Sequence, residues 1–149
     1  MKKIKQTFLT PLLFLFALTL FASCKRETGY IISVNNRASY DVIMEYVTSE
    51  SKDTITMIVP RCEPNIPLNC NFLPIYSDTA EGALGGMSFG VFRQKLHYMH
   101  LYTFDTSYVM IEDLDLTDIN KYTHGTTWDG RTETHEYKLS IGDGHFEEK

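Results

Sequence analysis

Short β-prone runs, separated by turn-forming residues, follow one another along most of the chain. Runs rich in β-branched and aromatic residues lie at 30–34, 40–47, 54–59, 87–92, 97–104 and 107–111. Glycine, asparagine, aspartate or proline occurs between most of them, and these residues favour turns. Runs of this length and spacing predict an all-β or mainly-β domain: an antiparallel sandwich or open barrel of about seven short strands with at most one short helix.

The second run alternates in the way expected of a half-buried strand. Tyr40, Val42, Met44 and Tyr46 share one face, and the other face mixes charged and aliphatic side chains. We expect the aromatic face to be buried. Asn35-Asn36 would end the strand before it, because asparagine tolerates a positive φ.

Asp129-Gly130 is the clearest turn signal. This pair is favoured in two-residue hairpin loops. The run after it alternates cleanly, which places four side chains inward: His135, Tyr137, Leu139 and Ile141. The sequence therefore predicts a hairpin near the C-terminus.

Other segments are read as loops or left open. We expect loops over 60–74, which holds four prolines, and over 79–86. Phe92, Leu96 and Met99 also fit a helical period, so the aromatic run near 97–104 has two readings. Residues 116–122 predict one or two helical turns, capped by Thr117 or Asp115.

The N-terminus has the layout of an export signal. Basic residues precede an apolar run over 8–21, and Ala22-Ser23-Cys24 closes it with small side chains. The segment resembles the lipobox of bacterial lipoproteins, which implies cleavage of residues 1–23 and a diacylglycerol on Cys24. The alternative is an uncleaved membrane helix, but the run is shorter than the roughly 20 residues of a span.

The part after the cleavage site divides into a short tether over 24–29 and one β-rich domain over 30–149. Five residues after Cys24 reach at most about 17 Å, so the domain must lie close to its membrane. This part holds 11 Lys+Arg and 19 Asp+Glu, a net charge of −8. Such an acidic chain argues against nucleic-acid partners and against a polybasic membrane contact.

Cys62 and Cys70 form an even pair once Cys24 carries lipid. An exported protein allows them to form a disulfide, which would stiffen the proline-rich segment between them. Two free thiols are the alternative.

Gly86-Met87-Ser88-Phe89-Gly90 matches the G-x-S-x-G pattern of α/β-hydrolases. Asp113 and His135 even follow Ser88 in the required order. The pattern needs a buried strand before the serine and a helix after it, within a parallel sheet. Since we predict a glycine loop there, we assign no catalytic residue and expect no enzyme.

Metal and cofactor sites are not expected either. The five histidines have no ligand spacing such as H-x-H or H-E-x-x-H. The acidic stretch 112–118 lacks the glycine and glutamate of an EF-hand loop, because Asp118 and His124 occupy those places.

Aromatic side chains give the remaining indication of a partner. Most tyrosines should fill the core, but Trp128, beside the predicted turn, is a candidate exposed binding residue. Tyrosine and tryptophan contact sugar rings and protein partners, so a glycan and a protein both remain open.

The chain as a whole resembles the small single-domain lipoproteins of unknown function found in Bacteroides-type bacteria. The resemblance rests on Phe21-Ala22-Ser23-Cys24 and on Val34-Asn35-Asn36 with Tyr40-Asp41-Val42. It implies a lipid-anchored address in the cell envelope, at the outer membrane, with the periplasmic or surface side open. We expect a binding or assembly module; a purely structural envelope lipoprotein and a small enzyme are the alternatives.

Overall fold

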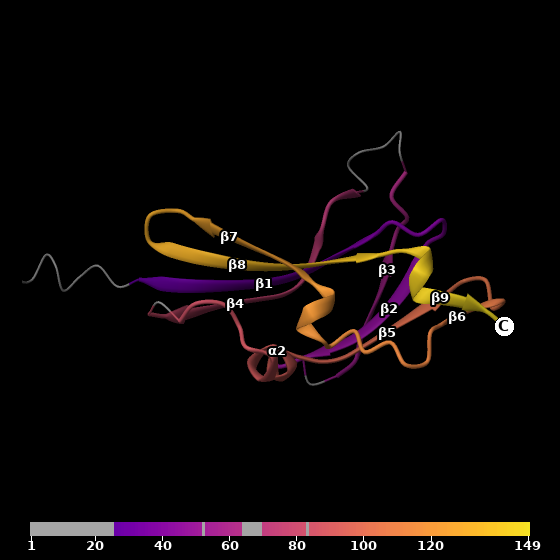
Figure 1. The fold of residues 1–149 in the computed structure, drawn as a ribbon, viewed down its shortest axis with the longest axis horizontal. Helices are drawn as coiled ribbons and strands as arrows, with labels where there is room; N and C mark the ends of the chain where they lie inside the picture. The colour runs from indigo at the N-terminus through magenta and orange to yellow at the C-terminus, as the bar shows by residue number, and fades with distance from the viewer. Residues whose placement is uncertain (1–25, 52, 64–69, 83) are drawn as a thin grey trace, which may run out of the picture.

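A computed structural model describes residues 26–51, 53–63, 70–82 and 84–149 (Figure 1). The elements in chain order are β1 (Glu27–Asn36), β2 (Val42–Thr48), β3 (Ile55–Val59), β4 (Leu73–Glu81), α2 (Phe89–Lys95), β5 (Leu96–Thr103), β6 (Tyr108–Met110), β7 (Thr123–Trp128), β8 (Thr132–Ile141) and β9 (Phe146–Glu148), with short 3-10 helices at Ile119–Lys121 and Asp143–His145. The predicted mainly-β class is confirmed, with nine strands in the described part rather than about seven.

The largest sheet has the order β4-β1-β8-β7. β1 lies in its interior and pairs with β8 in parallel over its whole length, from Glu27 opposite Thr132 to Asn36 opposite Ile141. The antiparallel expectation is therefore wrong for this pair, although the other pairs in the sheet are antiparallel. A parallel pair needs a long connection, and here the connection is most of the domain.

The observed start of β1 shows that the predicted tether over 24–29 is too long. β1 begins at Glu27 rather than Tyr30, so residues 27–29 of the predicted tether belong to the sheet. At its other end the strand includes Asn35 and Asn36, which are buried and do not adopt a positive φ.

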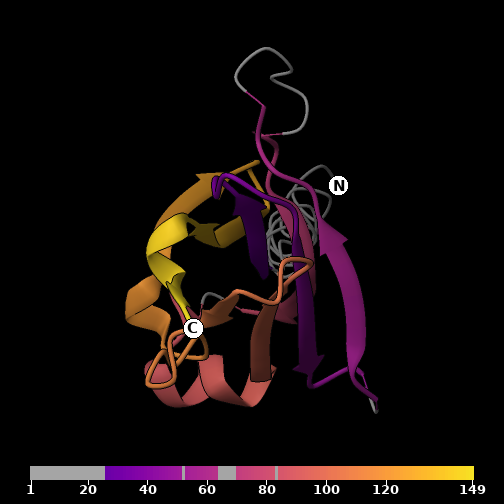
Figure 2. The same ribbon diagram turned by 90° about the vertical axis from the view of Figure 1, so that its right-hand side faces the viewer.

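A second sheet, β3-β2-β5, shares one hydrophobic core with the first. Val42, Met44 and Tyr46 of β2 point into this core, as their alternation predicted. His135, Tyr137, Leu139 and Ile141 of β8 are buried, also as predicted. β3 lies at one margin of the ribbon (Figure 2), and the small sheet β6-β9 adds Phe146 to the core.

β4 was not predicted, because most of it fell in the segments read as loops. Pro74 lies at a bulge: Ser33 pairs with Pro74 and Ile32 with Tyr76, which leaves Ile75 as an extra residue. Proline lacks an N–H and is tolerated on an edge strand or at a bulge, and β4 offers both.

The helix α2 replaces the strand predicted over 87–92. Ser88 is its N-cap, since the Ser88 hydroxyl accepts a hydrogen bond from Val91 N at 3.3 Å. Phe92 points inward and is fully buried. The strand reading of residues 97–104 is confirmed by β5, and that of 107–111 by β6.

The turn predicted near the C-terminus is present but shifted by one residue. Asp129 N donates to Thr132 O at 3.2 Å, so Gly130 and Arg131 are the two loop residues. Gly130 takes a φ of 93°. The Asp129 carboxylate instead accepts hydrogen bonds from the backbone N–H groups of Thr132 and Arg131. These bonds hold the pKa of the Asp129 carboxyl below its usual value.

The helical turn predicted over residues 116–122 is present as the 3-10 helix Ile119–Lys121. Its N-cap, however, is Asp118 rather than Thr117 or Asp115. Asp115 instead accepts hydrogen bonds from the backbone N–H and the hydroxyl of Thr117.

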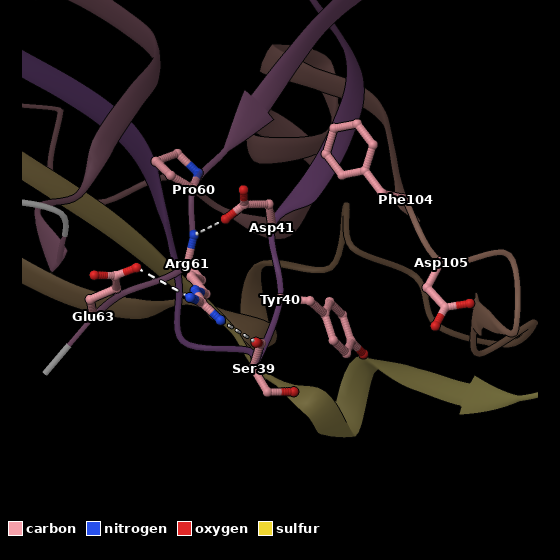
Figure 3. Close-up of a pocket in the computed structure, with 8 residues that line it drawn as sticks. All are labelled: Ser39, Tyr40, Asp41, Pro60, Arg61, Glu63, Phe104 and Asp105. Carbon is pink, nitrogen blue, oxygen red and sulfur yellow. Dashed lines mark hydrogen bonds and ion pairs between the residues drawn. The ribbon is translucent and has the colours of Figure 1, made fainter.

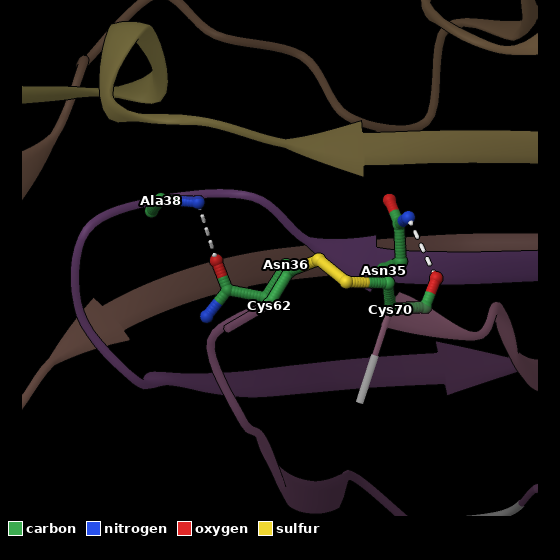
Figure 4. Close-up of a disulfide and its surroundings, with 5 residues drawn as sticks. All are labelled: Asn35, Asn36, Ala38, Cys62 and Cys70. Carbon is green, nitrogen blue, oxygen red and sulfur yellow. Dashed lines mark hydrogen bonds between the residues drawn. A yellow bond between two sulfur atoms is a disulfide. The ribbon is translucent and has the colours of Figure 1, made fainter. Parts of the chain in front are cut away.

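Cys62 and Cys70 form the predicted disulfide, with their Cα atoms 4.7 Å apart (Figure 4). The bond lies beside the end of β1: Cys62 N donates to Asn36 O, and the Asn35 amide donates to Cys70 O. These two hydrogen bonds hold both cysteines of the disulfide against the end of β1.

Candidate functional site

The outward side of the β3-β2-β5 sheet brings together side chains from three separate runs of sequence. Alternation places Val42, Met44 and Tyr46 in the core, so the intervening residues face away from it. We call the outward residues of these strands the outer face: Thr56, Ile58, Ile43, Glu45, Val47, Tyr98, His100 and Tyr102.

The strand register arranges the outer face in rows. Ile58, Ile43 and Tyr102 lie opposite one another and form an apolar row. Ile58 is 56% exposed and Tyr102 is 40% exposed. Thr56, Glu45 and His100 form the next row, which is polar. An apolar strip therefore lies beside polar groups, on a surface that none of the strands in the described ranges covers.

β5 contributes a line of rings along the outer face. The rings of Tyr98 and His100 are nearly parallel, with centroids 6.4 Å apart. Those of His100 and Tyr102 are 4.5 Å apart and tilted. Successive outward residues of a strand are spaced about 6.8 Å apart, so these three rings form a continuous aromatic line.

The Tyr102 hydroxyl is held as a donor. It donates to Glu45 Oε2 at 3.1 Å, across the strand pair. Partial burial first, and then the hydrogen bond to Glu45, raise the pKa of Tyr102 to about 12. Tyr102 therefore keeps its proton at neutral pH, and its ring is fixed in place for contact.

A pocket of about 530 Å³ lies where the outer face meets the end of the sheet (Figure 3). Asp41 and Phe104 lie just beyond the paired ends of β2 and β5, and Pro60 just beyond β3. Phe104 is 61% exposed. The pocket residues are Ser39, Tyr40, Asp41, Pro60, Arg61, Glu63, Phe104 and Asp105.

Arg61 organises the polar wall of this pocket. Its backbone N–H donates to Asp41, and its guanidinium donates to Ser39 O and contacts Glu63 at 3.3 Å. All of these groups are exposed, so the wall can exchange its hydrogen bonds for those of a partner. The outer face and the pocket together make up the candidate site.

Two of the five histidines lie together although they are 11 positions apart in the sequence. His124 of β7 and His135 of β8 lie side by side, with His124 Nε2 and His135 Nδ1 2.9 Å apart. Among the described residues, Nε2 of the buried His135 has no hydrogen-bond partner, and the Glu133 carboxylate lies 3.6 Å from it. His97 and His100 lie on opposite sides of β5. Within the described ranges no cluster of three or more histidine, cysteine or acidic side chains could hold a metal ion.

The remaining predicted site residues have separate places. Trp128 ends β7 and is 53% exposed, with the Arg26 guanidinium 5.8 Å from its ring centre. Ser88 has the structural role of a helix cap. Cys24 lies outside the described residues. No helix in the described part is long and apolar enough to cross a membrane.

Sequence reasoning missed the outer face. The alternation of Tyr98, His100 and Tyr102 was available as a signal. Their neighbours Ile43 and Ile58 depend on a register between three strands, which no single run reveals. No protein-family model, curated protein or solved structure matches this chain.

Proposed function

We propose that this protein is a lipid-anchored binding module of the bacterial cell envelope, which docks a protein partner on the outer face of the β3-β2-β5 sheet. The anchor is the lipid expected on Cys24, at the outer membrane. The docking surface is carried by one observation: an exposed apolar row, Ile58–Ile43–Tyr102, flanked by polar groups.

The composition of the face favours a protein over a glycan. Protein interfaces combine an apolar centre containing tyrosine with a polar rim. Here the row of Ile58 and Tyr102 is the centre, and Glu45 with the pocket residue Arg61 supplies the rim. The two isoleucines beside Tyr102 favour a protein in particular, because their side chains offer a glycan no hydrogen bond.

A site-specific photocrosslinker tests this proposal in intact cells. We expect a crosslinker at Ile58 to give a discrete protein adduct that depends on Tyr102, and Tyr102→Ala to reduce its yield. The matched control is a crosslinker at Ser140, which is exposed on the other sheet.

The same adduct from Ser140, or one from Ile58 that survives Tyr102→Ala, would contradict docking on this face. Adducts that consist of carbohydrate alone would favour a glycan partner. A chain that gives no adduct from Ile58 while remaining in the envelope would favour a purely structural lipoprotein.

A further inference from the structure

We propose that the end of the domain carrying Trp128 and Leu84 lies in the headgroup layer of the membrane to which the protein is anchored. This inference rests on the lipid anchor of the proposed function. It adds an orientation and a second membrane contact, and it gives a role to the exposed tryptophan.

Three segments meet at this end of the domain, where β1 begins (Figure 1). Gly82 N, just after β4, donates to Arg26 O at 2.7 Å. On the other side of β1, Glu27 N donates to Arg131 O, in the hairpin loop between β7 and β8. The first described residues of the chain are therefore fixed between two loops.

A large apolar side chain is exposed beside each of these loops, one at the end of β7 and one two positions after Gly82. Trp128 is 53% exposed and Leu84 is 63% exposed. Leu84 N donates to the Thr28 hydroxyl, which holds its backbone against the start of β1. Tryptophan prefers the boundary between membrane and water, because its ring is apolar and its N–H can still form a hydrogen bond.

The length of chain between Cys24 and the sheet limits how far this end of the domain can lie from the membrane. Arg26 is two positions after Cys24, and two residues span at most about 7 Å. The headgroup layer is about 5–8 Å thick on each side of the hydrocarbon core. A lipid on Cys24 would therefore keep Arg26, Glu27 and the two loops bonded to them at the headgroups.

Charge does not provide the attraction. Arg26 and Arg131 lie at this end, but so do four acidic residues: Glu27, Glu81, Asp129 and Glu133. The contact therefore depends on the tether, which gives the two apolar side chains a high effective concentration at the surface. We expect Trp128 to enter the headgroup layer only in the anchored protein.

Trp128 is the single tryptophan of the chain, so its fluorescence reports on this contact alone. The experiment places the lipidated protein in vesicles of phosphatidylethanolamine and phosphatidylglycerol, with acyl chains brominated near the headgroups or left unbrominated. We expect bromination to lower the fluorescence by roughly half, because the bromines lie directly below the layer that holds the indole.

The matched control moves the probe to the far end. In the double variant Trp128→Phe, Phe104→Trp, the tryptophan replaces an exposed ring beside the pocket. Its fluorescence should not change with bromination. Equal quenching at both positions, or none at Trp128 in protein that floats with the vesicles, overturns the orientation alone. Protein that lacks lipid on Cys24 by mass spectrometry and does not float overturns the anchor as well.

Discussion

Asn36 shows how one buried polar side chain directs the chain from one sheet to the next. Its amide donates to Tyr40 O at 2.8 Å and to Val59 O at 2.9 Å, and its Oδ1 accepts from Ala38 N at 2.9 Å. These bonds tie the end of β1 to the turn after it and to β3. The residue expected to end a strand by its backbone instead organises the corner by its side chain.

Asn36→Ala should destabilise the protein by about 2–4 kcal/mol, because buried backbone groups lose their partners. Urea unfolding measures this free energy. The neighbouring Asn35 is the control: its amide makes a longer bond, 3.3 Å to Cys70 O, and no residue in the described part of the chain bonds to its Oδ1. Asn35→Ala should therefore lower the free energy of unfolding by less than Asn36→Ala does. An equal or larger decrease for Asn35→Ala would show that the three hydrogen bonds of Asn36 do not cause the loss of stability.

At the scale of elements, α2 is held at both ends. Ser88 caps its start, and Lys95, its last residue, forms an ion pair with Asp78 of β4 at 2.7 Å. The Lys95 ammonium first, and then the Tyr76 hydroxyl, hold the pKa of Asp78 below its usual value. The helix is thus fastened to the edge strand that the sequence did not reveal.

This ion pair gives a dependence of stability on pH. A carboxyl whose pKa is lowered by folding stabilises the protein above its unfolded pKa, about 3.9, and loses that contribution as pH falls below it. Lys95→Met should therefore cost about 1 kcal/mol at pH 7, and the difference from wild type should shrink below about pH 4. Urea unfolding at both pH values checks this. Arg93→Met is the control, since its pair with Asp115 is longer and more exposed. A loss for Lys95→Met that is the same at both pH values would exclude the ion pair as its cause.

Elements with a regular period could be predicted, and those held by distant contacts could not. β2 and β8 alternate over enough residues to identify the core face. β4 contains Pro74, and its pairing with β1 joins residues that are 39 to 54 positions apart, which leaves no local signal. The parallel pairing of β1 with β8 is more remote still, since its partners are 105 positions apart. The outer face could not be predicted for the same reason: its apolar row combines one residue from each of three runs, and only the pairing of the strands brings them together.

At the scale of the whole molecule, attachment and binding lie at different places. Trp128 and Leu84 lie at the end where β1 begins, whereas the disulfide and the pocket residue Arg61 adjoin Asn36, where β1 ends. Ten residues of strand separate these ends by about 33 Å. In the anchored orientation that we propose, the pocket would project away from the membrane.

Cys24→Ala should release the domain from the membrane fraction once the signal is cleaved. The part after the cleavage site has a net charge of −8, and Trp128 with Leu84 is too small a patch to hold it without the lipid. Fractionation of cells followed by an alkaline wash measures the release. Cys62→Ala with Cys70→Ala is the control, because it removes cysteines without touching the anchor. A Cys24→Ala domain that is cleaved yet stays with the membrane would contradict the lipid anchor.

The place of β1 has a mechanical consequence. A partner held on the outer face and a lipid at the N-terminus would pull on the domain in opposite directions, and β1 would receive the load first. Ladders on both sides of this strand, to β4 and to β8, run parallel to such a pull. Force along a strand loads all the hydrogen bonds of its ladders together in shear, whereas force across a strand opens them one at a time. β1 would thus transmit the force between the membrane and the partner, with its hydrogen bonds to β4 and β8 loaded in shear.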